Sequence, residues 1–240
     1  MSKQVQAIVL SAALAAVAAT TAQASVLANE TFTYNNGNLV GNGGWAAHSG
    51  AGSVPVQVTS GAAVLAQGSL TREDVNLGVT AIGAGQTYYA GFDLTNAGGN
   101  QTVYFAHFLQ GASTFRGRVF ITAGSSGDFT VGLSDTATLN QTWATGLTFG
   151  TTYRVVVSYD FDTGTNKLWV NPATESSTSL TATGTASTAV AGFALRQAAG
   201  NSVQTIDNLI VATSFAEAVP TPGSAALLGI GGLIAMRRRR

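Results

Sequence analysis

Carboxyl groups are the first side chains that could do chemistry in this chain, because enzymatic cleavage of a glycosidic bond uses two of them about 5–9.5 Å apart. The 240-residue sequence has only 11 Asp and Glu residues. Glu73 and Asp74 form a close pair, but successive side chains on a strand point to opposite faces of the sheet. We therefore expect a solvated strand end beside Arg72, and the sequence predicts no catalytic residue and no enzyme.

A second group of oxygen ligands lies in the segment around Gly164. Asp160, Asp162 and Asn166 stand there at alternate positions, as oxygen ligands do in a Ca²⁺ loop. The later Glu that closes an EF-hand loop is missing, and a turn between strands selects the same residue types for its backbone. We predict a turn, with a Ca²⁺ site formed by Asp160, Asp162 and Asn166 as the alternative, and no other cofactor.

The two histidines, His48 and His107, are candidates for a general base. A nucleophile elbow of the form G-x-S-x-G is absent from the sequence. In an unbroken strand, His107 would share a face with the apolar residues Phe105 and Leu109. We therefore interpret His107 as a structural histidine, while nothing in the Gly-rich segment around His48 would orient that ring.

Three tryptophans could bind sugar rings, because the face of an indole is a stacking platform with a polar edge. They are Trp45, Trp143 and Trp169. Trp169 is opposite in parity to Leu168 and Val170, so one side of its strand could expose an aromatic ring. We take Trp45 and Trp169 as ligand-binding candidates, with burial in the core as the alternative.

In the segments that must position these side chains, apolar residues recur at every second position. No stretch keeps the apolar period of a helix over three turns. Short apolar runs are separated by turns rich in Gly, of which the chain has 29, against only 4 Pro. About ten such segments predict an all-β fold, an antiparallel β-sandwich. The predicted strands are Val54–Val58, Ala62–Ala66, Gln86–Thr95, Thr102–Gln110, Phe115–Thr122, Asp128–Leu133, Thr152–Asp160, Lys167–Asn171, Val190–Gln197 and Gln204–Ala212.

One two-stranded unit in this pattern resembles a known family. The segment Thr152–Pro172, with Thr-Gly in its turn and Leu-Trp-Val-Asn-Pro on its return, resembles a strand pair of concanavalin A-like (laminin-G-like) jelly-roll domains. Glu30–Tyr34, followed by a Gly-rich loop to Trp45, is similar to the opening strand of exported members, and Ile206–Val211 is similar to their closing strand. The resemblance implies one concanavalin A-like jelly roll over residues 25–218.

The N-terminal segment, residues 1–24, has the features of a secretory signal peptide. Lys3 supplies a positive charge, and the apolar run that follows it is too short for a comfortable membrane span. Ala22 and Ala24 form an A-x-A cleavage site. We therefore predict that the mature protein begins at Ser25.

The C-terminal segment, residues 219–240, has three parts: a Pro-containing tetrad, an apolar run and a block of arginines. The apolar run, Gly223–Met236, would form a short transmembrane helix of about 21 Å, against about 30 Å for the hydrocarbon core. By the positive-inside rule, the arginines stay in the cytoplasm. The tetrad is Val219, Pro220, Thr221 and Pro222, and the arginines are Arg237, Arg238, Arg239 and Arg240.

This order of parts resembles the PEP-CTERM sorting signal, although Thr221 stands where the usual Val-Pro-Glu-Pro tetrad has Glu. The resemblance implies an exosortase-type processing enzyme as a partner and transient insertion of the C-terminal helix in the membrane. It also implies export through the inner membrane to the cell surface or extracellular matrix of a Gram-negative-type bacterium. A plain membrane anchor is the alternative.

The charge distribution excludes a nucleic-acid partner. Removing Lys3 and the four terminal arginines from the 11 basic residues leaves 6, whereas all 11 acidic residues stay in the middle of the chain. The predicted mature domain is therefore mildly acidic, and phosphate binding needs a basic face. The absence of Cys excludes disulfides and thiolate metal sites.

Three functions remain open for the exported domain. The first is a non-enzymatic, surface-sorted protein with an adhesive or structural role in the cell surface or exopolysaccharide matrix. The second is a carbohydrate-binding, lectin-like module with polysaccharide as its partner. The third, a glycan hydrolase or lyase, rests on fold analogy alone.

The sorting interpretation predicts the fate of two proline variants. Changing Pro220 and Pro222 to Ala should leave membrane insertion intact but prevent processing of the tetrad, so that full-length protein accumulates in the inner membrane. Fractionation of the native host with intact-mass measurement checks this outcome. A wild-type protein that keeps Arg240 at its final location would contradict the sorting interpretation and favour the plain anchor.

Overall fold

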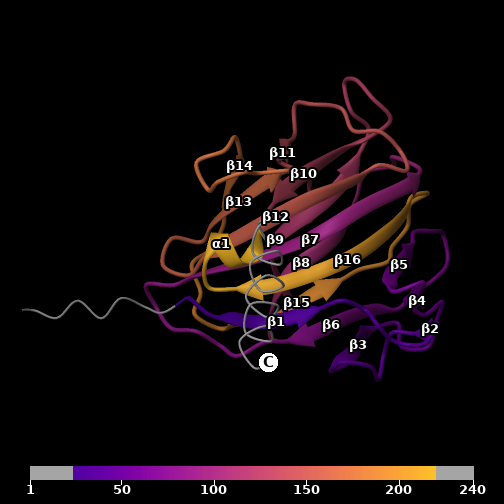
Figure 1. Ribbon diagram of the computed structural model, residues 1–240, viewed down its shortest axis with the longest axis horizontal. Helices are drawn as coiled ribbons and strands as arrows, with labels where there is room; N and C mark the ends of the chain where they lie inside the picture. Colours follow the sequence, from indigo (N-terminus) through magenta and orange to yellow (C-terminus); the bar gives the residue numbers. More distant parts are fainter. Residues whose placement is uncertain (1–23, 220–240) are drawn as a thin grey trace, which may run out of the picture.

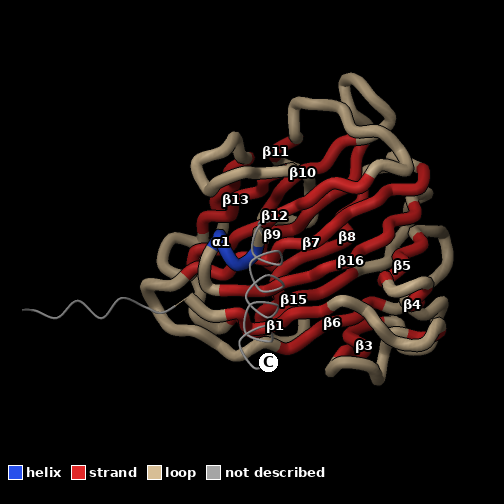
Figure 2. The backbone as a smooth tube through the Cα atoms, viewed as in Figure 1, coloured by secondary structure: helices blue, strands red, loops and turns tan. Residues whose placement is uncertain are grey.

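Two antiparallel sheets form from the period-two segments in the computed structural model, which describes residues 24–219 (Figures 1 and 2). The predicted antiparallel β-sandwich is thereby confirmed, and its two stacked sheets are those expected of a jelly roll. The predictions for Ala22, for the prolines of the tetrad and for the terminal arginines lie outside the described residues. Among the described residues are Ala24 and Ser25 at one end and Val219 at the other.

The larger sheet contains nine strands in the described part of the chain. Its strands are β1 (Val26–Glu30), β2 (Gly37–Asn38), β4 (Gln57–Thr59), β5 (Ala62–Ala66), β7 (Thr87–Gly98), β12 (Thr152–Asp160), β13 (Thr165–Val170), β14 (Leu180–Thr183) and β16 (Val203–Ala212). They pair in the order β14-β13-β12-β7-β16-β5-β4-β2, with β1 added on β16.

The smaller sheet contains seven strands within residues 24–219. Its strands are β3 (Trp45–Ser49), β6 (Asp74–Gly78), β8 (Val103–Gln110), β9 (Thr114–Thr122), β10 (Thr130–Ser134), β11 (Gln141–Thr142) and β15 (Val190–Leu195). They pair in the order β11-β10-β9-β8-β15-β6-β3.

Aromatic side chains fill the space between the two sheets. Phe92 on β7 meets Phe105 on β8 with ring centroids 6.1 Å apart and Phe193 on β15 at 6.0 Å. Phe108 on β8 meets Phe193 at 5.4 Å and Tyr159 on β12 at 6.3 Å. All of these side chains are fully buried. Because the chain has no Cys, this packed apolar layer, and no disulfide, holds the sheets together.

Strand β8 is irregular, and the irregularity decides which of its side chains face the core. Its register against β9 shifts between Tyr104 and Ala106 and again between Ala106 and Phe108. Such shifts break the alternation of faces along a strand. Phe105 and Phe108 consequently both pack in the core, while His107 packs against Tyr104 on the outer face. The predicted common face for Phe105 and His107 is therefore wrong, because it assumed an unbroken period of two.

All ten predicted strands overlap an observed strand, but six strands were not among them: β1, β2, β3, β6, β11 and β14. Several of these are short, and β3 and β14 consist mostly of small or polar residues, so that they show no apolar alternation. The predicted opening strand at Glu30–Tyr34 is also wrong. Strand β1 ends at Glu30, and Phe32 has a φ of 49°, which a strand does not permit.

A short helix, α1 (Phe215–Ala218), covers the outer face of the nine-stranded sheet. The Phe215 ring meets the ring of Trp169 with centroids 5.1 Å apart and that of Tyr89 at 6.0 Å. Within residues 24–219 there is no helix long and apolar enough to cross a membrane. The predicted transmembrane helix lies outside these residues.

The position of α1 is fixed by one arginine and one glycine. Arg154 donates from Nη2 to the carbonyl oxygen of Ala218 at 2.6 Å, and its Nη1 lies 3.2 Å from Asp93 Oδ1. A Cβ atom on Gly91 would collide with the same Ala218 carbonyl. The close approach of α1 therefore requires glycine at position 91.

The two ends of the described chain meet on this sheet. The backbone N–H of Ser25 donates to the Thr213 hydroxyl at 2.9 Å, and the N–H of Thr213 donates to the Ser25 carbonyl at 3.0 Å. Thr213 stands just before α1. The predicted mature start at Ser25 therefore lies beside the residues that lead into α1.

The contact between the sheets predicts a large cost for truncating a central ring. Phe105→Ala should lower the free energy of unfolding by about 3–5 kcal/mol, because it removes buried area and leaves a cavity. Leu70, which is 68% exposed, provides a matched control, and Leu70→Ala should change stability by less than about 0.5 kcal/mol. Urea denaturation measures both values. A loss under about 1 kcal/mol for Phe105→Ala would contradict its place in the core.

Candidate functional site

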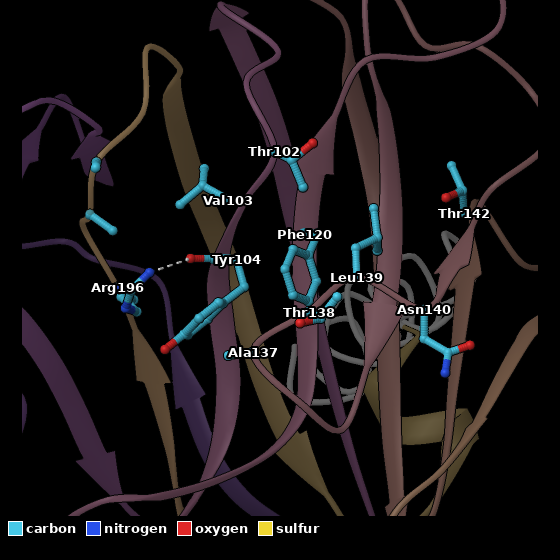
Figure 3. Close-up of a pocket in the computed structure, with 12 residues that line it drawn as sticks. Thr102, Val103, Tyr104, Phe120, Ala137, Thr138, Leu139, Asn140, Thr142 and Arg196 are labelled. Carbon is cyan, nitrogen blue, oxygen red and sulfur yellow. Dashed lines mark hydrogen bonds between the residues drawn. The ribbon is translucent and has the colours of Figure 1, made fainter.

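A groove of about 790 Å³ lies on the outer face of the seven-stranded sheet (Figure 3). It is built from β8, β9 and β11, the loop before β11 and the segment that follows β15. These segments are far apart in the sequence and come together only through the strand order. The groove is lined by Thr102, Val103, Tyr104, Phe120, Ala137, Thr138, Leu139, Asn140, Thr142, Arg196, Ala198 and Ala199.

The floor of the groove is apolar. Tyr104 and Phe120 are direct partners across β8 and β9, and their ring centroids lie 5.5 Å apart in an edge arrangement. The neighbours of Phe120 on β9, Val119 and Ile121, point into the core, so Phe120 faces outward, but it is only 2% exposed. Tyr104 is half-buried and is the ring that reaches the surface of the groove. Figure 3 shows Leu139 beside the Phe120 ring, and the exposed residues Thr138 and Asn140 continue from it along the loop. The groove therefore combines an apolar floor with hydroxyl and amide groups at its rim.

Arg196 is held at one side of the floor. Its guanidinium carbon lies 4.1 Å from the centroid of the Tyr104 ring, a cation–π distance. Its Nη1 donates to the Tyr104 carbonyl at 3.4 Å (Figure 3). Its Nε lies 3.9 Å from Asp74 Oδ2. A second guanidinium, that of Arg118, lies 5.3 Å from the same ring. Tyr104 is therefore flanked by two cations.

The carboxyl pair Glu73 and Asp74 is buried, which corrects the predicted solvated strand end. Asp74 accepts hydrogen bonds from the Ser49 hydroxyl at 2.8 Å and from the Gln197 N–H at 2.9 Å, and burial raises its pKa. Glu73 accepts from the Gly52 N–H at 2.9 Å. Both carboxyl groups are already engaged in holding loops to the sheet, and no acid–base pair faces the groove.

His107 is fully buried, as expected for a structural histidine, although it faces outward rather than into the core. Its ring stacks on Phe115 at 4.2 Å and lies 5.8 Å from the ring of His48. Its Nδ1 is 3.2 Å from the Phe108 carbonyl, so this nitrogen carries the proton, because a carbonyl only accepts. Burial lowers the pKa of His107 to about 3 and also lowers that of His48. Both rings are therefore neutral near pH 7.

The three Ca²⁺ candidates do not converge on one point. Asp160 Oδ1 accepts from the N–H groups of Asp162 and Thr163, which is a turn contact. The Asp162 carboxylate accepts from the Gly85 N–H, and the Asn166 amide donates to Asp135 at 3.2 Å. Within residues 24–219 there is no group of three or more His, Cys, Asp or Glu placed to hold a metal. The segment has the hydrogen bonds of the predicted turn.

The tryptophan candidates are placed away from any free surface. Trp45 is 2% exposed, lies against Phe32 and donates from Nε1 to Glu30 Oε2 at 3.0 Å. Trp169 is 0% exposed, because α1 covers its side of β13. The prediction that Trp45 and Trp169 offer rings to a sugar is therefore wrong. Trp143 is half-buried against the core.

Sequence reasoning missed Tyr104, Arg118 and Arg196, the residues that give the groove its character. Arg116 and Arg118 stand two apart on β9, and alternate residues on a strand share a face. That spacing was the signal for a positively charged sheet face. Arg196 follows β15, and no local pattern connects it to β8.

No protein-family model matches the chain, and no curated protein matches it. Among solved structures, it is similar to a sialidase with a TM-score of 0.56 and 13% identity, over 81% of this chain. It spans only 19% of the length of that sialidase chain. At this identity the likeness shows a shared fold.

Two further solved structures are similar to this chain with TM-scores below 0.5. One is a peanut lectin with a nine-residue peptide, with a TM-score of 0.48 and 15% identity over 80% of this chain and 98% of the lectin. The other is a β-glucanase from Bacillus licheniformis, with a TM-score of 0.47 and 12% identity over 79% and 99% of the two chains.

The buried His107 predicts that the protein loses stability in mild acid. Its pKa is about 3 in the folded state and about 6.5 in an unfolded chain, so the unfolded state binds the proton first. The stability that depends on a neutral His107 is fully present above about pH 7 and is lost as the pH falls through 6.5 towards 3. Between pH 7 and pH 5, the free energy of unfolding should fall by about 2 kcal/mol. Urea denaturation at these two pH values measures it.

His107→Gln is the comparison for this experiment, because it removes the titrating group and keeps a polar side chain. The variant should lose less stability than wild type between pH 7 and pH 5. The lowered pKa of His48 acts in the same direction, and the raised pKa of Asp74 acts against it at lower pH. Equal pH dependence in the variant and in wild type would show that His107 does not carry the effect.

Proposed function

We propose that this protein is a non-enzymatic carbohydrate-binding module, and that the groove on the seven-stranded sheet is its binding site. The observation that carries the proposal is an apolar floor, formed at the surface by the half-buried side chains of Tyr104 and Leu139, with a rim of hydroxyl and amide side chains. A sugar ring presents C–H groups on its faces and hydroxyl groups around its edge. The apolar floor suits the first and the polar rim suits the second.

The shape of the groove favours a chain over a small closed-in ligand. At about 790 Å³ it has room for more than one sugar residue, and it lies open along the sheet face (Figure 3). Figure 3 shows Thr102 above the Phe120 ring and Asn140 and Thr142 to its right. Hydrogen-bonding groups spread along the groove would contact successive residues of a polysaccharide.

The chemistry of the neighbouring side chains supports binding without catalysis. Hydrolysis of a glycoside uses two carboxyl groups on either side of the scissile bond. The groove lining contains no Asp or Glu. The nearby Asp74 is buried and already hydrogen bonded, and the protonated nitrogen of His107 is used by a backbone carbonyl.

The place of action that we propose comes from the two ends of the sequence. A signal peptide over residues 1–24 would export the chain through the inner membrane. An exosortase-type enzyme would process the tetrad at Val219–Pro222, so that the domain reaches the cell surface or extracellular matrix. Binding to polysaccharide there would be the adhesive function expected for a matrix protein.

The proposal predicts the effect of two groove variants on glycan binding. Tyr104→Ala, which removes the half-buried aromatic ring of the floor, should weaken binding by at least about tenfold. Asn140→Ala, which removes one rim amide, should weaken it by about two- to tenfold. Asn29→Ala is the matched control, because Asn29 is also exposed but lies on the other sheet, and it should bind like wild type. A glycan array followed by calorimetry on the purified protein measures these affinities.

A reducing-sugar assay and an assay for unsaturated products, run on every glycan bound, separate binding from catalysis. We expect no product. Release of product that stops in Tyr104→Ala would replace the binding module with a glycan-cleaving enzyme at the same groove. Failure to bind any glycan on the array would contradict the proposal as a whole.

A further inference from the structure

One arginine lines the groove, although the predicted mature domain carries more acidic than basic residues. This residue, Arg196, is the one charged residue of the lining. Arg118 is not part of the lining, but its guanidinium carbon lies 5.3 Å from the centroid of the Tyr104 ring. The groove therefore has a cationic end.

The charges of Arg118 and Arg196 are less closely neutralised than those of Arg116 and Arg154. Arg116 and Arg154 form ion pairs of 3.1 Å and 3.2 Å with Asp135 and Asp93. Arg196 reaches a carboxylate only at 3.9 Å. Arg118 donates from Nη1 to the backbone carbonyl of Asp135, which is a dipole and not a charge, and forms no ion pair within residues 24–219.

The Arg196 guanidinium is also held in place before any ligand binds. Its guanidinium carbon lies 4.1 Å from the Tyr104 ring centroid, and its Nη1 donates to the Tyr104 carbonyl. The side chain is 25% exposed, so part of it stays open to the groove. A guanidinium fixed on an aromatic ring presents its N–H edge as a fork, and such a fork matches the two oxygens of a carboxylate.

We propose that the groove binds an acidic polysaccharide, one that carries carboxylate groups as a polyuronic acid does, with Arg196 as the carboxylate-binding residue and Arg118 as a supporting cation. This inference rests on the proposed function and names its ligand class. The floor contacts the sugar ring and the cationic end contacts the acid group of the same or the next residue. Neutral glycans would use the floor alone and bind more weakly.

The test compares three polysaccharides by isothermal titration calorimetry with the purified protein: polygalacturonate, dextran and dextran sulfate. We expect polygalacturonate to bind at least about tenfold more tightly than dextran, because one charge-assisted hydrogen bond changes affinity by about that factor. Its affinity should fall with added salt. Binding of dextran sulfate as tightly as polygalacturonate would show general attraction of polyanions and overturn the assignment to carboxylates.

The arginine variants locate the effect. Arg196→Gln should weaken binding of polygalacturonate by at least about tenfold and leave binding of dextran unchanged. Arg196→Lys, which keeps the charge but lacks the fork, should recover only part of that loss. Lys167→Gln removes one exposed positive charge from the other sheet and should bind like wild type. Circular dichroism checks the fold of each variant, and Arg118→Gln gives a second reading if Arg196→Gln is unfolded.

The two proposals fail in distinguishable ways. If dextran binds as tightly as polygalacturonate and Tyr104→Ala weakens both, the groove is a carbohydrate site and the acidic ligand class is wrong. If polygalacturonate binds and Arg196→Gln and Arg118→Gln both leave that binding unchanged, the assignment of the cationic end is wrong. If no polysaccharide binds, the carbohydrate-binding function itself is wrong.

Discussion

The irregular pairing of β8 with β9 is the constraint on which both the core and the groove depend. An unbroken strand would place Phe105 and Phe108 on opposite faces. The two register shifts bring both rings into the layer between the sheets, where they meet partners from β7, β12 and β15. The same shifts leave Tyr104 and His107 on the outer face. One local irregularity thus supplies aromatic groups to both sides of the strand.

The two sides use these aromatic rings differently. In the core, the rings are fully buried, and their packing stabilises a chain that has no disulfides. On the outer face, Tyr104 is only half-buried, and its ring carries the Arg196 guanidinium. A cation held on a ring beside open solvent stabilises the fold less than a buried pair would. The contact between Arg196 and Tyr104 therefore contributes little to stability compared with the core.

The fold could be predicted from the sequence where alternation is unbroken, as on β7 and β12. On β7, Tyr88, Ala90, Phe92 and Leu94 all enter the core, as the period of two predicts. The alternation of apolar residues does not show what covers the outer face of a strand. It therefore predicts an exposed Trp169, whereas α1 buries this residue. The site could not be predicted, because its lining comes from segments that only the strand order β10-β9-β8-β15 brings together.

The groove and helix α1 occupy opposite faces of the sandwich. Helix α1 packs on Trp169, Tyr89 and Val156, which alternate with core residues on the nine-stranded sheet and so face outward there. Tyr104 and Phe120 face outward from the seven-stranded sheet. A tail that continues past Val219 therefore starts on the side away from the groove.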